Sequence, residues 1–284
     1  MVTSVSHIAT GDKTEARVDP IWQQLRDEAE SAARAEPALA SVLNAGIMKQ
    51  SSLEGAVAGR VVERLRGQLV ALGIETEAIR QAFKQMATAD QNWSMVLRAD
   101  IAAVFDRDPA CDRYLEPVLY FKGFQALQAH RLANWLWTAD RRDFALAVQS
   151  AVSAAFHIDI HPAVPMGRGI FMDHGTGIVI GSTARLGDNV SILQGVTLGG
   201  TGKEEGDRHP KVESGVLIGA GAQVLGNIEI GHCSRIGAGS VVLSSVPPMK
   251  TVAGVPAKII GEAGCAEPAR SMDHMLIGAG AVEF

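Results

Sequence analysis

The chain has 284 residues, of which 47% are hydrophobic and 20% charged, and its net charge is −5. This balance is typical of a folded globular protein, and the negative charge argues against a general nucleic-acid or membrane-surface role. The sequence contains no run of 18 apolar residues and no apolar segment near its start, so it predicts neither a membrane span nor a secretory signal. Its three cysteines form no C-x-x-C pair, which favours reduced thiols and a cytoplasmic location.

The first half of the chain has the pattern of a helical domain. Residues 1–19 are polar, and we expect them to form a flexible N-terminus. Residues 20–156 are rich in alanine, with apolar residues at helical spacing, and Pro117 is placed to begin one of the later helices. One helical face carries Val61, Val62, Leu65 and Leu69. We therefore expect an all-α domain over 20–156.

At His157 the composition changes from helix formers to glycine, valine and isoleucine, and aliphatic residues then recur at every sixth position. The first ladder comprises Ile180, Leu186, Ile192 and Leu198. The second comprises Val212, Ile218, Val224, Ile230, Ile236 and Val242. This period predicts the stacked coils of a parallel β-helix, with about 18 residues in each triangular coil. We expect that domain over 157–260, followed by a flexible C-terminal tail over 261–284.

The ladder is interrupted twice. Its phase slips by two residues between Met172 and Ile180, and the sequence does not place the slip within that stretch. Between Leu198 and Val212 no aliphatic residue is present, so we expect an inserted loop that leaves the coil. Such irregularities allow side chains to point outward, away from the core.

Both interruptions contain residues that suit chemistry. The loop is rich in glycine and carries Lys203, Arg208 and Lys211, which could hold an anion, although a solvated surface loop is the alternative. The phase slip contains His174 beside Asp173. Several histidines in this half also leave a zinc site open, since zinc accepts three histidines in some catalytic sites.

Longer motifs resemble those of serine O-acetyltransferases, within the hexapeptide-repeat acyltransferases, over roughly residues 20 to 260. The motifs in the coils are Asp159-Ile160-His161-Pro162, Gly167-Arg168-Gly169-Ile170, Asp173-His174-Gly175-Thr176-Gly177-Ile178, Ser191-Ile192-Leu193-Gln194, Val196-Thr197-Leu198-Gly199-Gly200-Thr201-Gly202-Lys203, Asp207-Arg208-His209-Pro210-Lys211 and Ala253-Gly254-Val255-Pro256-Ala257-Lys258. Those in the helical half are Arg107-Asp108-Pro109-Ala110 and Tyr120-Phe121-Lys122-Gly123-Phe124.

The resemblance implies an α+β architecture, in which an N-terminal all-α domain precedes a left-handed parallel β-helix with a protruding loop. It also implies trimers packed along the β-helix, paired through the helical domains into a hexamer, with active sites between neighbouring β-helices. The helical domain would then serve oligomerisation and contribute Asp108 to the site.

The implied activity is transfer of the acetyl group of acetyl-CoA to the hydroxyl of L-serine, which gives O-acetyl-L-serine and CoA and begins cysteine biosynthesis. By resemblance His174 is the general base and Asp159 orients its ring, with direct transfer and no acyl-enzyme. Asp159 and His174 are fifteen positions apart, so the spacing alone does not bring them together. Acetyl-CoA is the co-substrate, and no permanently bound cofactor or metal is implied.

The resemblance also assigns the binding residues. The ammonium of serine would be held by Asp108 and Asp173, and its carboxylate by Arg208 and His209, since a guanidinium offers a planar fork. Acetyl-CoA would be bound by Gly200, Thr201, Ala220, Ala238 and Lys258. Feedback inhibition by L-cysteine in the serine site is implied as well.

Other readings remain open at this stage. The chain ends at Phe284 where family members often end in isoleucine, so binding to O-acetylserine sulfhydrylase is not expected from the family pattern. A hexapeptide acetyltransferase acting on a sugar or xenobiotic alcohol is the first alternative. A β-helical zinc hydratase of the gamma carbonic anhydrase type and a non-enzymatic scaffold are the others.

Overall fold

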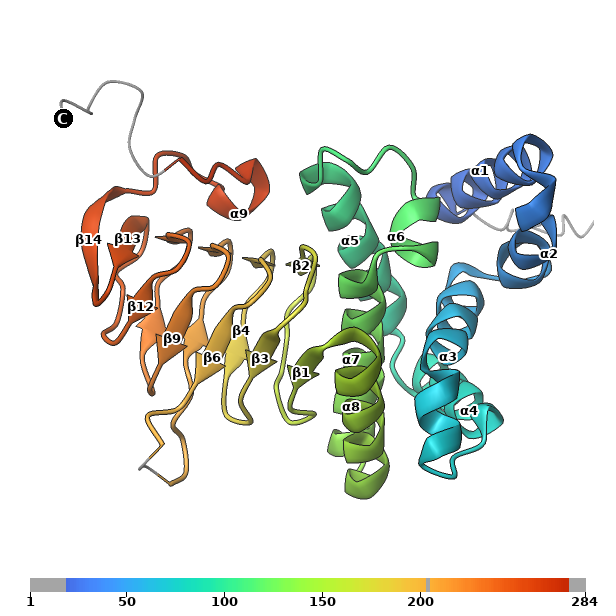
Figure 1. Cartoon of the computed structure of the whole chain (residues 1–284), viewed down its shortest axis with the longest axis horizontal. Coiled ribbons are helices and arrows are strands. Elements are labelled where there is room, and N and C mark those ends of the chain that lie inside the picture. Colours follow the sequence, from blue (N-terminus) through green and yellow to red (C-terminus); the bar gives the residue numbers. More distant parts are fainter. Residues whose placement is uncertain (1–18, 203–204, 276–284) are drawn as a thin grey trace, which may run out of the picture.

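The computed structural model describes residues 19–202 and 205–275, and it places the helices at one end and the β-coils at the other (Figure 1). The helical segments before the first strand are α1 (Pro20–Ala35), η1 (Pro37–Leu39), α2 (Ala40–Leu43), η2 (Asn44–Met48), α3 (Leu53–Ala71), α4 (Thr76–Ala89), α5 (Asn92–Arg107), α6 (Leu115–Leu119), α7 (Lys122–Thr138) and α8 (Arg142–Phe156).

Helix boundaries follow local chemistry. Asp19 caps α1 by accepting from the Trp22 N–H, and Ser52 caps α3 by accepting from the Gly55 N–H. The predicted face of α3 is buried, with Val61, Val62, Leu65 and Leu69 each at most 1% exposed. That helix ends before Gly73, whose φ of +70° favours glycine.

Pro117 does not begin a long helix as predicted. It lies inside the short α6, and the chain breaks at Tyr120–Phe121 before α7 begins at Lys122. The break lets the first turn of α7 approach the β-helix closely, because a side chain at Gly123 would stand only 2.0 Å from the Met172 carbonyl oxygen. This contact is tertiary, so the helical pattern alone did not predict it.

The strands form three sheets that make the faces of a left-handed parallel β-helix. The first sheet contains β1 (Ile158–Ile160), β3 (Ile178–Ile180), β6 (Thr197–Gly199), β9 (Gln223–Leu225) and β12 (Val241–Val242). The second contains β4 (Arg185–Leu186), β7 (Lys211–Val212) and β10 (Glu229–Ile230). The third contains β2 (Phe171–Met172), β5 (Ser191–Ile192), β8 (Leu217–Ile218), β11 (Arg235–Ile236), β13 (Lys250–Gly254) and β14 (Ala257–Glu262).

The hexad prediction is confirmed. Every residue of both ladders is buried, and the most exposed of them, Leu186, is only 5% exposed. All strand pairs are parallel except β13 with β14. The predicted loop is confirmed too, since Leu186 pairs with Val212, 26 positions on, whereas Val224 pairs with Val242, 18 positions on.

The expectation of a flexible tail over 261–284 is wrong for the part that the structure describes. Residues 261–262 complete β14, and Pro268–Ser271 form the short helix α9, which lies between the coils and α5 (Figure 1). Ala263 and Ala269 are each 1% exposed, so tertiary contacts order a segment without any repeat. Residues 1–18 and 276–284, where the other flexible stretches are predicted, lie outside the described residues, as does Phe284.

Buried polar contacts join the helical part to the first coil. The Asp100 carboxylate is fully buried and accepts from Arg131 at 2.6 and 2.8 Å and from the Ile170 N–H at 3.2 Å. Arg131 in turn donates to the Gly167 carbonyl at 2.8 Å. The junction is therefore fixed rather than a loose linker. None of the described helices has the length and apolar character needed to cross a bilayer.

Candidate active site

His174 lies where the first coil departs from the regular repeat. Ile158 pairs with Ile178, 20 positions on, whereas Ile180 pairs with Leu198, 18 positions on. At this corner the Thr176 carbonyl accepts from the Gly195 N–H of the next coil. One coil later, the Gln194 carbonyl accepts from the Gly221 N–H in the same way.

This equivalence identifies the two additional residues. Asp173 and Leu193 also occupy matching places. The Asp173 N–H donates to the Ile192 carbonyl of the following coil, and the Leu193 N–H donates to the Ile218 carbonyl of the coil after that. The residues without a counterpart are therefore His174 and Gly175. His174 adopts a φ of +54° and its side chain is 73% exposed, so the insertion turns the imidazole out of the repeat.

A cavity of about 690 Å³ opens beside this corner. Its walls come from the end of α5, the α6–α7 break and the first coil. Asp108, Asp173 and His174 all line it, which brings a residue of the helical half next to the inserted histidine. The family resemblance groups these three residues, although they lie up to 66 positions apart.

Two carboxylates give this cavity a negative wall. Burial raises the pKa of Asp173, and the nearby charge of Asp108 raises it further, while His174 and His274 act in the opposite direction. The His174 Nε2 lies 3.7 Å from the Asp173 Oδ1. Asp108 is oriented by the Ala110 N–H, which donates to its Oδ1 at 2.9 Å. A small cation such as an ammonium group suits such a wall.

Asp159 is not brought to His174 in this structure. It lies in the middle of β1, and its Oδ1 accepts from the Gln149 side chain of α8 at 2.7 Å. Among the described residues no hydrogen bond or ion pair links Asp159 to the imidazole. The spacing of fifteen positions is consistent with this separation, because it falls short of a full coil.

Arg208 and His209 lie at a different corner. Strand β3 begins after the His174 corner and ends at the corner that holds Thr183. The two corners therefore lie at opposite ends of the strands of one sheet, and each belongs to a different row of stacked corners, that is, to a different edge of the triangular β-helix. The backbone N–H groups of Arg208 and His209 donate to the Thr183 Oγ1 at 3.0 and 3.1 Å. Burial, followed by the charges of Arg208 and Lys211, lowers the pKa of His209. One chain therefore does not bring this pair to His174.

The five residues assigned to CoA binding are divided among three places. Ala220 and Ala238 lie on the same edge as His174, where the Ala220 carbonyl accepts from Gly239 just as Gln194 accepts from Gly221. Gly200 and Thr201 lie at the loop corner, and a side chain at Gly200 would stand 3.2 Å from Arg208 Cδ. Lys258 is exposed on β14.

Lys122 and Thr176 also line the cavity, although neither was assigned a role from the sequence. The Lys122 ammonium, in the first turn of α7, donates to the Thr176 hydroxyl. No local pattern reveals this pair, because its members are 54 positions apart. Within the described ranges, no three His, Cys, Asp or Glu side chains are grouped as ligands for a metal ion.

Comparison with known proteins identifies the family of the chain. A family described as "Serine acetyltransferase, N-terminal" matches residues 21–129, and one described as "Bacterial transferase hexapeptide (six repeats)" matches residues 209–244. The serine acetyltransferase of Salmonella typhimurium is 48% identical over 258 residues, which span 91% of this chain and 93% of the relative. The chain belongs to the serine acetyltransferase family.

Solved structures of serine acetyltransferases share its fold. The Brucella abortus serine acetyltransferase in complex with coenzyme A is 57% identical, with a TM-score of 0.83 over 87% of this chain and 98% of that one. A serine acetyltransferase in complex with cysteine is 45% identical, with a TM-score of 0.85 over 90% of this chain and 98% of that one. The family thus includes a protein solved with coenzyme A and a protein solved with cysteine.

Proposed function

We propose that the chain is a serine O-acetyltransferase, which transfers the acetyl group of acetyl-CoA to the hydroxyl of L-serine and releases CoA. The observation that carries this proposal is the cavity in which Asp108, Asp173 and His174 meet. It combines an outward-pointing imidazole with a carboxylate wall that suits the ammonium of an amino acid. Membership of the serine acetyltransferase family supports the same substrate.

His174 acts as the general base in this mechanism. A serine hydroxyl is a weak nucleophile at neutral pH, so a base must take its proton as the oxygen attacks the thioester carbonyl. The new C–O bond forms, the C–S bond breaks, and the proton on His174 passes to the departing sulfur of CoA. No acyl-enzyme is required.

Asp159 keeps its assignment as the group that orients the His174 ring and stabilises the imidazolium. This role requires Asp159 to exchange its Gln149 partner for the imidazole when substrates bind. Asp173 lies nearer, and we assign it with Asp108 to the substrate ammonium. Burial and then the charge of Asp108 raise the Asp173 pKa, and a bound cation would favour the charged form of Asp173 again.

The carboxylate of serine needs Arg208 and His209, which lie across the sheet from His174 in one chain. We propose that they come from a second copy, so that each active site lies between neighbouring β-helices of a trimer. Two such trimers paired through their helical domains would form the hexamer. CoA would then follow the edge formed by Ala220 and Ala238, with Gly200, Thr201 and Lys258 completing its site.

The deciding experiment is an assay of CoA release from acetyl-CoA with L-serine as acceptor. We expect activity with serine and none with a sugar or xenobiotic alcohol at equal concentration. His174→Ala should lower kcat by roughly 10²–10⁴-fold, the usual contribution of a positioned base. His174→Asn should lower kcat to a similar extent. It is the matched control for the backbone, since Asn tolerates positive φ but cannot act as a base. Full activity in both variants would contradict the assignment.

L-Cysteine should inhibit competitively with serine, because it has the same ammonium and carboxylate and differs only in its side-chain atom. The related structure with cysteine supports this expectation. Initial rates at several serine concentrations would measure it. Inhibition that is unaffected by serine would place cysteine elsewhere.

A complex with O-acetylserine sulfhydrylase stays open but is not expected, because Phe284 stands where family members often carry isoleucine. A pull-down with the full chain and with a variant lacking the last four residues tests this. Capture that depends on those four residues would contradict the expectation.

A further inference from the structure

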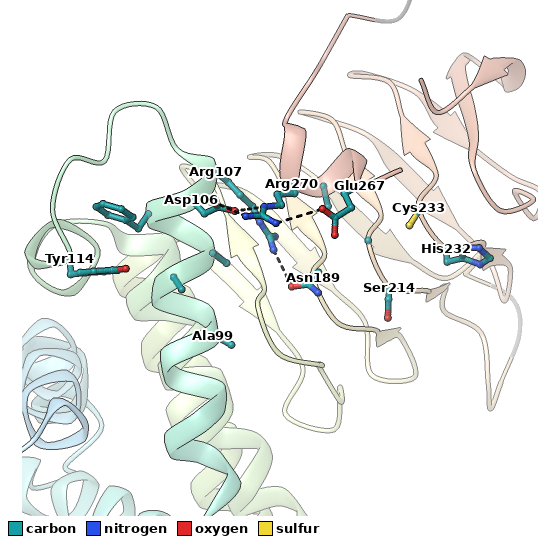
Figure 2. A pocket seen from close by; sticks show the side chains of 15 residues that line it. Ala99, Asp106, Arg107, Tyr114, Asn189, Ser214, His232, Cys233, Glu267 and Arg270 are labelled. Atoms are coloured by element: carbon teal, nitrogen blue, oxygen red, sulfur yellow. Dashed lines mark hydrogen bonds and ion pairs between the residues drawn. The ribbon is translucent and has the colours of Figure 1, made fainter. Parts of the chain in front are cut away.

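Arg107, the last residue of α5, fixes the end of that helix to the β-helix. Its side chain is almost fully enclosed, since the residue is 7% exposed. Its Nη1 donates to the Ser191 Oγ at 3.1 Å. Its Nη2 donates to the Asn189 Oδ1 at 3.2 Å (Figure 2). One guanidinium therefore bridges α5 to the second coil, 82 and 84 positions away.

The C-terminal helix α9 supports the same bridge from the other side. The Ser191 hydroxyl that accepts from Arg107 donates to the Ala269 carbonyl at 2.6 Å. Arg270 of α9 donates to both carboxylate oxygens of Asp106, at 2.6 and 3.3 Å (Figure 2). Both residues that precede Asp108 are thus held by side-chain contacts outside the helical part.

This network acts on both walls of the candidate pocket. Asp108 directly follows Arg107 and leaves the helix in an extended conformation, with ψ at 108°. On the other wall, Ser191 pairs with Phe171 of β2, and β2 leads within two residues to Asp173. Arg107 itself does not line the cavity that contains His174. Its contacts nevertheless tie the segment that carries Asp108 to the coil that pairs with β2, which leads to Asp173.

We infer that Arg107 is a positioning residue for the ammonium subsite, and that α9 supports it through Ser191 and Asp106. The inference rests on the proposed function, because it assigns the ammonium of serine to Asp108 and Asp173. It differs from a purely structural role in one respect. Loosening the network should weaken serine binding selectively, since none of the residues proposed to bind acetyl-CoA belongs to that subsite.

The test compares Arg107→Lys with wild type. A lysine keeps the charge, but its single ammonium cannot reproduce the planar fork that reaches both Ser191 and Asn189. We expect KM for serine to rise about tenfold, because a carboxylate displaced by about 1 Å loses much of its contribution. The KM for acetyl-CoA should change by less than about twofold, which is within the effect of a weak surface contact.

A double-mutant cycle shows whether Arg107 acts through Asp108. Asp108→Asn alone should raise KM for serine. Adding Arg107→Lys to it should then raise that KM by less than about threefold, because residues that act as one unit are not additive. Independent, multiplicative effects of the two changes would overturn the inference.

The role of α9 is tested by Arg270→Gln, which removes the charged pair with Asp106. It should raise KM for serine in the same direction but by only about threefold, since this pair is exposed. Arg168→Gln is the matched control, because Arg168 is an exposed arginine on the coils and pairs with Asp188. That control should leave both KM values unchanged.

The outcomes separate the inference from the proposed function. A wild-type protein that does not acetylate serine contradicts the function itself. An active wild type with equal rises in both KM values for Arg107→Lys keeps the function and overturns the positioning role. Melting temperatures of all variants show whether any loss comes from unfolding.

Discussion

At the scale of single residues, His174 shows how a small departure from a repeat creates a chemical group. An imidazole at a regular ladder position would point into the core of the β-helix. The two added residues, His174 and Gly175, turn the chain through positive φ values of 54° and 75°. The histidine thereby projects toward Asp108, on a different part of the fold.

His130 is a buried histidine that the mechanism does not use. Its Nε2 donates to the Val164 carbonyl at 3.0 Å, and its Nδ1 has no hydrogen-bond partner among the residues that the structure describes. Burial lowers its pKa to about 3, and the nearby charge of Arg131 adds to this. The folded protein therefore keeps His130 neutral while an unfolded histidine, with a pKa of about 6.5, takes up a proton.

This difference predicts a loss of stability in acid. The unfolded state binds more protons below about pH 6.5, so stability is present above that pH and declines as pH falls toward the folded pKa. Between pH 7 and 5 the free energy of unfolding should fall by about 2 kcal/mol from this residue alone. In His130→Gln, which retains a donor toward Val164, that part of the decline should be absent.

Urea unfolding at fixed protein concentration would measure both proteins at pH 7 and pH 5. The difference between their two declines isolates His130 from the carboxylates, which titrate in both. Identical declines would show that His130 becomes protonated without cost in the folded state.

At the scale of elements, the first coil can be compared with the coil that follows it. Asp173 and Thr176 match Leu193 and Gln194, which are adjacent in sequence. The coil corner therefore closes without His174 and Gly175 elsewhere in the same protein.

Deleting His174 and Gly175 together should give a regular 18-residue coil that still folds. We expect β-sheet circular dichroism close to that of wild type, with activity lowered at least about 10²-fold because the base is gone. The deletion also removes the close approach of the chain at Gly175 to Ile158, where a side chain would stand 2.5 Å from the Ile158 Cδ1, so a modest fall in melting temperature is expected. Retained activity would show that another residue supplies the base.

At the scale of the whole molecule, the separation of His174 from Arg208 and His209 makes the assembly part of the mechanism. The two corners lie on different edges of the triangular β-helix, at opposite ends of the strands of one sheet. A single chain therefore presents half of a proposed site at each of these two edges. Closed cyclic symmetry would place the edge of one copy against the opposite edge of the next.

Co-expression of His174→Ala with Arg208→Ala tests this arrangement. Each variant alone should be inactive, but in mixed trimers roughly a quarter of the interfaces combine an intact His174 with an intact Arg208. We therefore expect activity to return to roughly a quarter of the wild-type level for randomly assembled trimers. Mixing the purified proteins without subunit exchange is the control, and it should restore nothing. Failure to recover activity in verified mixed trimers would place the whole site within one chain.

The sequence by itself determined the scaffold and its two interruptions. The six-residue ladder from Ile180 to Val242 is a property of local spacing, and each aliphatic residue in it is buried as predicted. The slip before Ile180 and the loop before Val212 were visible because a repeat reveals any departure from itself. The membership of Asp108 in the site came from resemblance, and the cavity beside His174 contains it.

Tertiary structure alone decided which residues meet. The ordered segment around α9 has no repeat, and its position depends on Asp106 and Arg235, far away in sequence. The bridge from Arg107 to Ser191 joins two segments that carry no shared pattern. The partner of Asp159 is Gln149, a contact that sequence spacing could not reveal. Periodicity records which face of the chain is buried, whereas side-chain contacts between distant segments depend on how those faces pack together.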